Sequence, residues 1–344
     1  MTMRLLDACH RRTVDVTPIW LMRQAGRYLP EYRAIRDKLS FIEMCRRPDV
    51  AAEVTLQPLE RFDLDAAIVF ADILLPLEGM GIGFHFAEGD GPVIERTVRG
   101  PADLEGVLAG DPRADVPYVL EALRLVRGEL AGRVPLIGFA GAPFTLASYV
   151  IEGGHSRTYA EVKKLMYGQP ATFERLMTLL AETVAAYLLA QVEAGAQVLQ
   201  LFDSWVGALG PYDYERYVLP HSRRVLQAVA RADVPIIHFA NGASAMLPLA
   251  ARAGGDVVGV DWRIDLDRAW DDVGDGVGLQ GNLDPVALLG PVDEVKARAA
   301  DVLRRARRRP GHIFNLGHGL LPATPPDTVK ALVEFVHEWQ GEDR

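Results

Sequence analysis

The sequence predicts an α/β fold, a single (β/α)₈ TIM barrel with an N-terminal extension, in which residues 1–344 make one domain. Short apolar segments alternate along the chain with longer amphipathic ones, which is the pattern of parallel strands covered by helices. The length also suits a barrel. No glycine-rich turn follows the first predicted strand, where a doubly wound sheet would more often carry one. The barrel is therefore preferred to the doubly wound alternative.

Seven apolar segments, most of them ending at polar residues or glycine, are the predicted strands. In chain order they are residues 65–70, 134–140, 196–202, 234–240, 256–261, 277–282 and 312–317. The amphipathic segments between them predict helices, among them residues 117–131, 171–194, 219–232 and 292–308. A weaker eighth strand, near residues 18–21 or 93–98, would close the barrel.

Composition and charge exclude several classes of protein. The chain is 49% hydrophobic and 24% charged, as in a globular protein with a large core, and its net charge of −9 argues against a nucleic-acid partner. No apolar run reaches the roughly 18–20 residues of a membrane span, and the first residues lack the apolar core of a signal peptide. Cys9 and Cys45 form neither a disulfide framework nor a C-x-x-C motif. We expect a cytoplasmic enzyme without membrane contacts.

One basic run, residues 304–309, holds five arginines in six positions at the end of a helical pattern. Cations suit the C-terminal end of a helix because of its dipole. We interpret the run as a solvated surface rather than as a nucleic-acid site.

The densest motif is P-I-W-L-M-R-Q-A-G-R-Y-L-P-E-Y-R, residues 18–33, which gathers three arginines around a glycine. Arg23 and Arg27 are four positions apart, so a helical turn or a compact loop can aim both guanidinium groups at one place. Two such groups in an acidic chain indicate a ligand that carries more than one carboxylate or phosphate.

Polar residues follow nearly every predicted strand, and in a barrel the chemistry lies at the carboxyl ends of the strands. Asp72 is either a helix cap or a functional carboxylate. Asp203 and Ser204 each either cap the next helix or have a functional role, which for Ser204 would be a hydroxyl that donates to a ligand carboxylate. Without a G-x-S-x-G motif, Ser204 is not expected to be a nucleophile. His318 lies in N-L-G-H-G-L, where glycines leave the imidazole accessible to a ligand.

Tyr149 lies in a second dense motif, G-F-A-G-A-P-F-T-L-A-S-Y-V-I-E-G-G (residues 138–154), and is either a core tyrosine or a ligand contact. A glycine-rich loop late in a barrel often binds phosphate, so a phosphosugar enzyme is an alternative. His238 has alanine two positions on, where a zinc site would use cysteine, and neither cysteine is near in sequence. We therefore expect no metal site.

Both long motifs resemble those of the uroporphyrinogen decarboxylase family of haem biosynthesis, and F-A-D-I-L, L-F-D-S-W and N-L-G-H-G match in the same order. The resemblance covers about residues 4–335. It implies a (β/α)₈ barrel, a homodimer, and conversion of the four acetate side chains of uroporphyrinogen III into methyl groups, giving coproporphyrinogen III without cofactor or metal. It places substrate-binding residues at Arg23, Gln24, Ala25, Gly26, Arg27, Asp72, Tyr149, Ser204 and His318, with a further basic position at Arg36.

The residues suit such a substrate. A reduced macrocycle with eight carboxylates needs cations at its rim and an apolar floor, to which Phe41, Phe70 and Phe202 could contribute. Protonation of a pyrrole α-carbon makes an iminium-like cation that accepts the electrons left by CO₂, so no separate electron sink is required. Asp72 is the predicted electrostatic stabiliser of that cation, and the proton donor is left open.

Two other functions are considered. The first is a zinc-dependent corrinoid or thiol methyltransferase of related fold, against which the alanine at position 240 argues. The second is a non-catalytic porphyrin-binding protein, and turnover of uroporphyrinogen would distinguish it from the enzyme.

Overall fold

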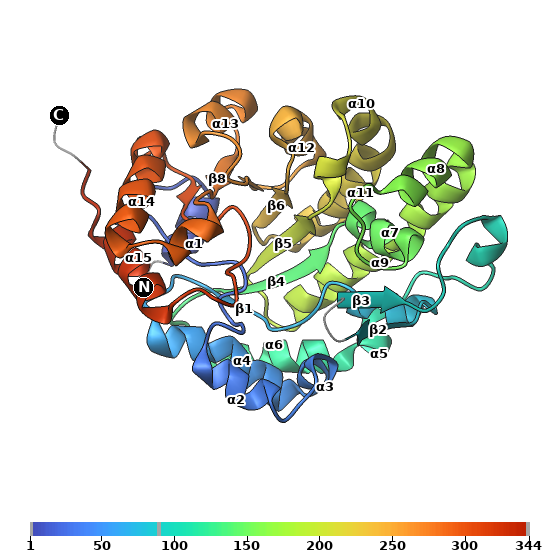
Figure 1. The fold of residues 1–344 in the computed structure, drawn as a ribbon, viewed down its shortest axis with the longest axis horizontal. Coiled ribbons are helices and arrows are strands. Elements are labelled where there is room, and N and C mark those ends of the chain that lie inside the picture. Colours follow the sequence, from blue (N-terminus) through green and yellow to red (C-terminus); the bar gives the residue numbers. More distant parts are fainter. Residues whose placement is uncertain (1–2, 88–90, 342–344) are drawn as a thin grey trace.

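Seven parallel strands form a curled sheet flanked by helices in the computed structural model, which describes residues 3–87 and 91–341 (Figure 1). The spatial order is β1-β4-β5-β6-β7-β8-β9, so each strand of this sheet pairs in parallel with the next one along the chain. The bounds are β1 (Ala67–Ile68), β4 (Leu136–Gly141), β5 (Val198–Asp203), β6 (Ile236–Ala240), β7 (Val257–Gly259), β8 (Gly278–Gln280) and β9 (His312–Ile313). All seven predicted strands are confirmed, although several are shorter than expected.

The eighth position of the barrel is filled by residues 18–21. Ile19 makes a parallel bridge with Phe314, next to β9, and the Phe314 N–H donates to the Pro18 carbonyl over 2.8 Å. On the other side, the Asp65 N–H donates to the Ile19 carbonyl over 2.8 Å, just before β1. This segment therefore closes the sheet between its last and first strands, and the predicted (β/α)₈ barrel is confirmed.

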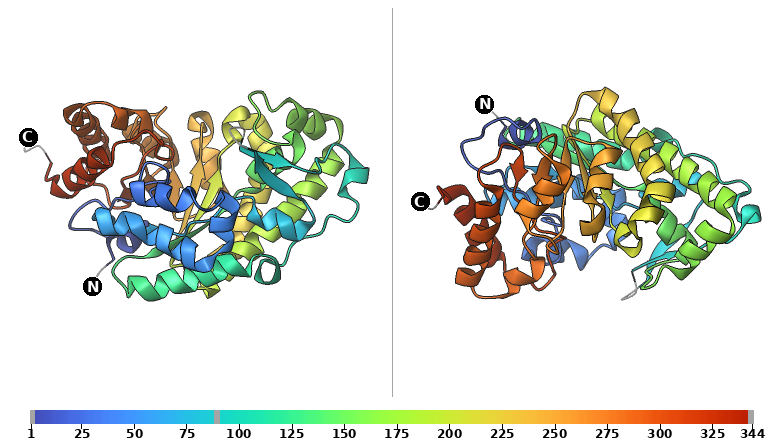
Figure 2. Two further views of the ribbon diagram at one scale, coloured as in Figure 1. Left: turned by 60° about the horizontal axis from the view of Figure 1, so that its bottom comes forward. Right: turned by 90° about the horizontal axis from the view of Figure 1, so that it is seen from above.

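The other candidate for the eighth strand, residues 93–98, is wrong. Gly91–Ile94 is strand β3, which pairs antiparallel with β2 (Phe84–Ala87) in a separate ribbon. The Ile94 N–H donates to the Gly153 carbonyl, which fastens this ribbon to the loop after β4 and its helix. Figure 2 shows the ribbon at the end of the molecule opposite to the C-terminal helices.

The helices lie mainly around the outside of the sheet (Figure 1). They are α1 (Arg4–Cys9), α2 (Pro30–Arg36), α3 (Phe41–Arg46), α4 (Pro48–Arg61), α5 (Pro112–Asp115), α6 (Pro117–Leu130), α7 (Pro143–Glu152), α8 (Ala160–Gly168), α9 (Pro170–Glu193), α10 (Pro211–Asp213), α11 (Leu219–Val229), α12 (Leu247–Ala253), α13 (Leu266–Val273), α14 (Val292–Ala306) and α15 (Pro326–Glu338). Tighter or wider turns are η1 (Leu75–Met80), η2 (Pro101–Leu104), η3 (Val206–Ala208), η4 (Tyr214–Val218), η5 (Ala230–Ala232), η6 (Ser244–Met246) and η7 (Pro285–Leu289). The four predicted helices correspond to α6, α9, α11 with η5, and α14.

Helix α6 illustrates how local sequence sets these elements. Pro117 occupies its first turn, where a missing N–H is harmless. Val119, Leu123 and Val126 recur at helical spacing and are buried. Ala131 then adopts a left-handed conformation, with φ of 47°, and ends the helix.

Helix α9 is long and apolar enough to cross a membrane by length and composition, with a mean hydropathy of 1.3. The expectation that no apolar segment reaches such a length is therefore wrong for this helix. In the structure, however, 56% of the apolar window is buried, and the helix packs against α11, α7 and β4. It has the position of a core helix.

A chain of buried polar groups crosses the inside of the barrel. The Trp20 indole N–H donates to Gln280 Oε1 over 2.9 Å, and the Gln280 amide donates to Gln200 Oε1 over 3.1 Å. Residues 276–281, G-V-G-L-Q-G, have the G-x-G-x-x-G spacing, but they run through strand β8 instead of a strand-to-helix turn. They therefore do not form the phosphate-binding turn of a doubly wound sheet.

At the N-terminal end of the barrel strands, Asp65 joins three parts of the chain. It accepts hydrogen bonds from the Ile19 N–H and from His337 Nε2, each over 2.8 Å, and from Arg4 Nη1 over 3.4 Å. Arg4 also forms an ion pair with Asp15. The N-terminal segment, the start of β1 and helix α15 are thereby connected through one carboxylate.

The basic run at residues 304–309 lies at the end of α14, as predicted. Arg305 forms ion pairs with Asp265, Asp267 and Asp301. Arg309 lies 3.9 Å from Asp271. These arginines lie at the surface, as the interpretation of the run as a solvated surface predicts, and the structure adds the ion pairs.

Candidate active site

The predicted functional residues follow strand positions that end at one face of the barrel. Asp72 comes shortly after β1, Ser204 directly after β5 and His318 shortly after β9. Arg23 follows the segment that fills the eighth position. Because the carboxyl ends of parallel strands share one edge, these side chains converge on the mouth of the barrel.

The sequence leaves open whether Asp72 is a helix cap or a functional carboxylate, and in the structure the N-cap of η1 is Leu74 rather than Asp72. Its Oδ1 accepts a hydrogen bond from the Leu74 N–H over 2.9 Å, in front of η1. Among the described residues, no hydrogen bond reaches its Oδ2, and the side chain is recessed although part of its surface meets solvent. Burial raises the pKa of Asp72 to about 6, against opposing contributions from the Leu74 N–H and the nearby Arg23. One oxygen of the carboxylate is therefore left without a protein donor among the described residues.

Arg23 is held in an uncommon backbone conformation. Its φ is 61°, and the Gln24 N–H donates to the Leu21 carbonyl over 2.9 Å, which makes a turn with Arg23 at its third position. Glycine is favoured there, so an arginine indicates a constraint other than stability. The turn leaves the Arg23 side chain exposed and packed against Gly319, where an added Cβ would lie only 2.3 Å from Arg23 Cδ.

His318 lies between two positive charges. Burial and the nearby Arg23 and Arg263 guanidinium groups lower the pKa of His318 to about 4, so the imidazole is neutral at physiological pH. Its Nδ1 accepts the Gly319 N–H over 2.8 Å. Since that nitrogen is an acceptor, the proton of the neutral ring resides on Nε2, which becomes a hydrogen-bond donor.

Tyr149 faces the same site from helix α7. Its ring contacts Trp205 edge-on, with centroids 5.8 Å apart. Burial and the nearby Asp72 raise the pKa of Tyr149 to about 12, so the hydroxyl stays protonated. Trp205 follows Ser204 in the loop after β5, and it also contacts His155 and Tyr159. An aromatic cluster around Trp205 therefore lines this side of the mouth.

Ser204 is positioned by a hydrogen-bond relay through the Thr145 hydroxyl. Its N–H donates to Thr145 Oγ1 over 2.8 Å, and Thr145 Oγ1 donates to Asp203 Oδ1 over 3.1 Å. Asp203 is fully buried and does not cap the following helix, so the capping interpretation is wrong for this residue. Burial raises the pKa of Asp203 to about 7, against the hydroxyl contacts. The relay fixes the loop of Ser204 to the helix that carries Tyr149.

Arg27 and Arg36 belong to a second, outer group. Both are exposed, and both lie close enough to the Tyr32 hydroxyl to oppose the rise in the pKa of Tyr32 that burial produces. The Tyr32 ring contacts Phe70 edge-on at 5.8 Å, and Phe41 contacts Phe70 at 5.6 Å. These arginines therefore rise from an aromatic surface that extends toward Asp72.

Phe202, the third residue predicted for the apolar floor, lies in a different aromatic group. Its ring contacts Phe139 at 5.6 Å and Phe239 at 5.9 Å, on the inward-facing side of three neighbouring strands. The three phenylalanines predicted for the floor therefore belong to two aromatic groups, one inside the barrel and one that includes Tyr32.

Gln24, between Arg23 and Arg27, has a structural role. Gln24 is buried, its Oε1 accepts the Leu21 N–H and its amide donates to the Ala66 carbonyl. Its side chain is therefore directed into the core and away from the mouth. Ala25 and Gly26 are partly exposed, so contacts from them would involve main chain or a methyl group.

His238 points away from the mouth. It is fully buried on the outer face of the sheet, and its Nδ1 lies 3.3 Å from the Ala250 carbonyl of helix α12. Within residues 3–87 and 91–341, no group of three or more His, Cys, Asp or Glu side chains is placed to hold a metal ion.

Sequence reasoning missed Arg263, which follows β7. Its Nη1 donates to Asp261 Oδ2 over 3.1 Å, and its guanidinium stacks on Trp262 at 4.2 Å from the ring centroid. The sequence did contain a signal, because D-W-R at residues 261–263 ends a predicted strand with a buried acid and an exposed base. Nothing local indicates that this base lies beside His318.

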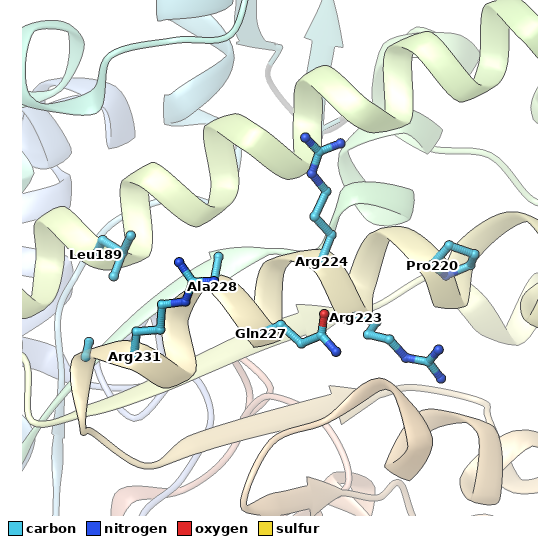
Figure 3. Close-up of a pocket in the computed structure, with 8 residues that line it drawn as sticks. Leu189, Pro220, Arg223, Arg224, Gln227, Ala228 and Arg231 are labelled. Carbon is cyan, nitrogen blue, oxygen red and sulfur yellow. The ribbon is translucent and has the colours of Figure 1, made fainter.

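Two hollows lie away from the mouth. One, of about 520 Å³, lies between α9 and α11 and is lined by Arg223, Arg224 and Arg231 (Figure 3). Another, of about 380 Å³, is lined by residues 59–64 and their neighbours. Both are open surface grooves without any of the residues described above. The mouth is the better candidate, because it gathers the perturbed acid, the neutral histidine and the arginines.

Comparisons with known proteins match this chain over nearly its whole length. The uroporphyrinogen decarboxylase (URO-D) family model matches residues 2–339. A uroporphyrinogen decarboxylase of Carboxydothermus hydrogenoformans is 58% identical over 333 residues, which cover 97% of this chain and 95% of the relative. One from Roseiflexus sp. (strain RS-1) is 55% identical over 344 residues, covering 98% and 99%.

Solved structures of similar shape include a methyltransferase from Methanosarcina mazei, with a TM-score of 0.82, 24% identity and coverage of 97% of each chain. A B12-independent methionine synthase from Shewanella sp. W3-18-1 has a TM-score of 0.57 at 9% identity and covers 84% of this chain and 87% of its own. At such low identities, the likeness shows the fold alone.

Proposed function

The chain belongs to the uroporphyrinogen decarboxylase family, and we propose that it converts uroporphyrinogen III into coproporphyrinogen III at the mouth of its barrel. The observation that carries the proposal is full-length similarity, at 50–58% identity, to curated uroporphyrinogen decarboxylases. The convergence of Arg23, Asp72, Tyr149 and His318 supports it, because Arg23 is close enough to the other three groups to lower the pKa of each.

The reaction requires an electron sink, which the substrate supplies. Protonation of a pyrrole α-carbon gives an iminium-like cation. Cleavage of the bond between the acetate CH₂ and its carboxylate releases CO₂ and neutralises that cation, leaving an exocyclic methylene. Protonation of the methylene and loss of the ring proton give the methyl group. Each acetate thus consumes one proton and releases one CO₂, and no oxidant or reductant is needed.

Asp72 is the proposed electrostatic stabiliser of the cation. Its unused Oδ2 can accept pyrrole N–H hydrogen bonds, which strengthen as positive charge develops on the ring. A carboxylate at a weakly hydrated position acts more strongly on that charge than one in water. The raised pKa of about 6 still leaves Asp72 mostly ionised at neutral pH.

The arginines are the proposed carboxylate anchors. Arg23 holds acidic side chains close to Asp72, and Arg27, with Arg36, does so at the outer rim. His318 adds a neutral Nε2–H donor, which binds a carboxylate without itself being charged. Tyr149 and Ser204 supply hydroxyl groups at the opposite wall, and Gln24, Ala25 and Gly26 shape the turn.

We also infer one domain, a homodimer and a cytoplasmic location. A continuous apolar core that runs from Leu5 to Val336 supports the single domain. Exposed Tyr167 and Tyr212, on segments that follow β4 and β5, offer apolar surface for a second copy. The net charge of −9 supports a function without nucleic acid, and the core position of α9 supports one without membrane contact. Both are consistent with the proposed cytoplasmic location. Light scattering of the wild type and of Tyr212→Ser would test the dimer.

Uroporphyrinogen turnover is the deciding experiment. Anaerobic incubation with uroporphyrinogen III, followed by separation of the porphyrins after oxidation, should reveal products with seven, six, five and four carboxylates. Asp72→Asn is the matched control for turnover at this site, and it should form these products far more slowly than the wild type. Tight binding without CO₂ release would instead identify a porphyrin-binding protein. Loss of activity on chelation, with recovery on adding zinc, would revive the methyltransferase alternative.

A further inference from the structure

Arg263 is built into the mouth in a way that an ordinary surface arginine is not. Its side chain is 51% exposed, while its partner Asp261 is 1% exposed. The guanidinium is fixed from two directions, by the Asp261 carboxylate and by the Trp262 ring. Stacking and a charged hydrogen bond together orient the fork before any ligand arrives.

The Asp261 carboxylate has hydrogen-bond donors other than the Arg263 side chain. It accepts the Arg263 main-chain N–H at Oδ1 over 2.8 Å and the Gly242 N–H at Oδ2. The carboxylate is therefore satisfied by the backbone of two loops, and the guanidinium is an addition to it. Arg263 uses Nη1 for this contact, and its Nε and Nη2 donors meet no other protein acceptor within the described residues.

The loop of Arg263 touches the loop of His318. A Cβ added at Gly317 would lie 2.4 Å from the Trp262 nitrogen, so only glycine permits this approach. Gly319, on the other side of His318, packs against the Arg23 side chain. The imidazole thus lies between Arg23 and Arg263, and its lowered pKa agrees with a cation on each side.

We propose that Arg263 is a further substrate-binding residue, which anchors a carboxylate of the macrocycle on the wall formed by the β7 loop. Arg23, the His318 Nε2–H and the free donors of Arg263 then form one continuous anion-binding edge. The arginine motif at residues 18–33 supplies only part of that edge. The role of Arg263 in catalysis rests on the proposed function, whereas its affinity for a polycarboxylate porphyrin can be measured separately.

The test compares Arg263→Gln with Arg268→Gln. Arg268 is 70% exposed, pairs with Asp272 and lies five positions on, so it controls for the loss of one surface charge. With uroporphyrinogen, Arg263→Gln should raise KM about tenfold, as expected for one lost charge-assisted hydrogen bond, and leave kcat within about twofold. Arg263→Lys should recover part of the affinity, since it keeps the charge but not the fork.

Fluorescence titration with uroporphyrin, the oxidised and unreactive analogue, supplies a readout that does not need turnover. Weaker binding by Arg263→Gln than by Arg268→Gln supports the assignment even if the wild type does not decarboxylate uroporphyrinogen, in which case only the proposed function fails. Equal affinities for the two variants, or a loss confined to kcat, would overturn it. Should Arg263→Gln not fold, Arg263→Lys carries the same comparison.

Discussion

The two ends of the first barrel strand hold carboxylates in contrasting surroundings. Asp65, before β1, accepts hydrogen bonds from the Ile19 N–H, His337 and Arg4. Asp72, after β1, accepts one, from the Leu74 N–H. Both residues are recessed from solvent, so the difference lies in their partners. The first carboxylate is saturated by the protein, whereas the second keeps an oxygen for something else.

The same contrast extends to the charges around them. At the N-terminal end, the hydrogen bond and the charge of Asp65 raise the pKa of His337 although burial opposes this. At the mouth, burial raises the pKa of Asp72 and lowers that of His318, so folding disfavours the charged form of each. At the N-terminal end, ion pairs connect distant segments of the chain. At the mouth, the ionisable groups lack such partners in the absence of a ligand.

The largest effect is expected at the N-terminal end. Asp65→Ala leaves His337 and Arg4 without their buried partner, and breaking such a buried pair typically removes about 3–5 kcal/mol from the free energy of unfolding. Urea unfolding would measure it, and kcat of the folded fraction should be unchanged. Asp63→Ala, at an 89% exposed carboxylate 3.4 Å from His337, should have little effect. If Asp65→Ala lowered kcat without lowering stability, the contrast between a structural Asp65 and a functional Asp72 would be wrong.

At the mouth, Asp72→Asn should lower kcat by about 10²–10³, the loss expected when one preorganised electrostatic group is removed. Its stability should not fall. A carboxyl whose folded pKa is raised binds its proton more tightly in the folded state, so the wild type loses stability as pH rises from about 4 to about 6. The variant lacks this loss and should melt higher than the wild type at pH 8. Near-normal turnover would exclude Asp72 from the mechanism.

Arg27→Ala tests the outer arginines. Loss of a charge-assisted hydrogen bond to a substrate carboxylate should weaken transition-state binding by about 1.5–3 kcal/mol, seen mainly as a higher KM. Arg47→Ala removes another exposed arginine, which pairs only with Asp49 among the described residues, so it is the control. Unchanged kinetic constants in Arg27→Ala would show that the outer rim does not hold substrate.

Substitutions at Arg23 should separate activity from stability, with a smaller effect on stability than those above. Arg23→Gly and Arg23→Ala both remove the guanidinium and should both lose activity. Only glycine relieves the left-handed backbone at φ of 61°, so Arg23→Gly should be about 1 kcal/mol more stable than Arg23→Ala. Thermal melts of the two variants would measure it, and equal stabilities would mean that the turn is unstrained.

The effect of pH on the stability contributed by the His337–Asp65 ion pair should be smaller still. Because the folded pKa of His337 is raised, its ion pair contributes fully below the unfolded pKa of about 6.5 and is lost as pH rises through the folded pKa. Only the charge of His337 changes in this titration, while the other hydrogen bonds of Asp65 remain, so we expect about 1 kcal/mol at most. Comparing the stability of the wild type and His337→Gln between pH 5 and pH 9 would test this, since the variant should lack that decline.

Much of the candidate site was visible in the sequence, because strand ends in a barrel can be located from local patterns. Asp72, Ser204 and His318 were selected by their place after apolar segments, and the structure puts each of them there. The direction of a side chain was less predictable. Asp203 and Ser204 are neighbours, but strand alternation turns Asp203 toward the helices and leaves Ser204 at the mouth.

By itself, the sequence determined the barrel class, the seven strand positions and the identity of the polar residues after them. These follow from periodicity and motif spacing, which are properties of neighbouring residues. Only the tertiary structure decided that residues 18–21 close the sheet, that Gln24 points inward and that Arg263 lies beside His318. Those outcomes depend on hydrogen-bond partners and packing between segments far apart in the chain, and local sequence does not specify which distant segment will provide them.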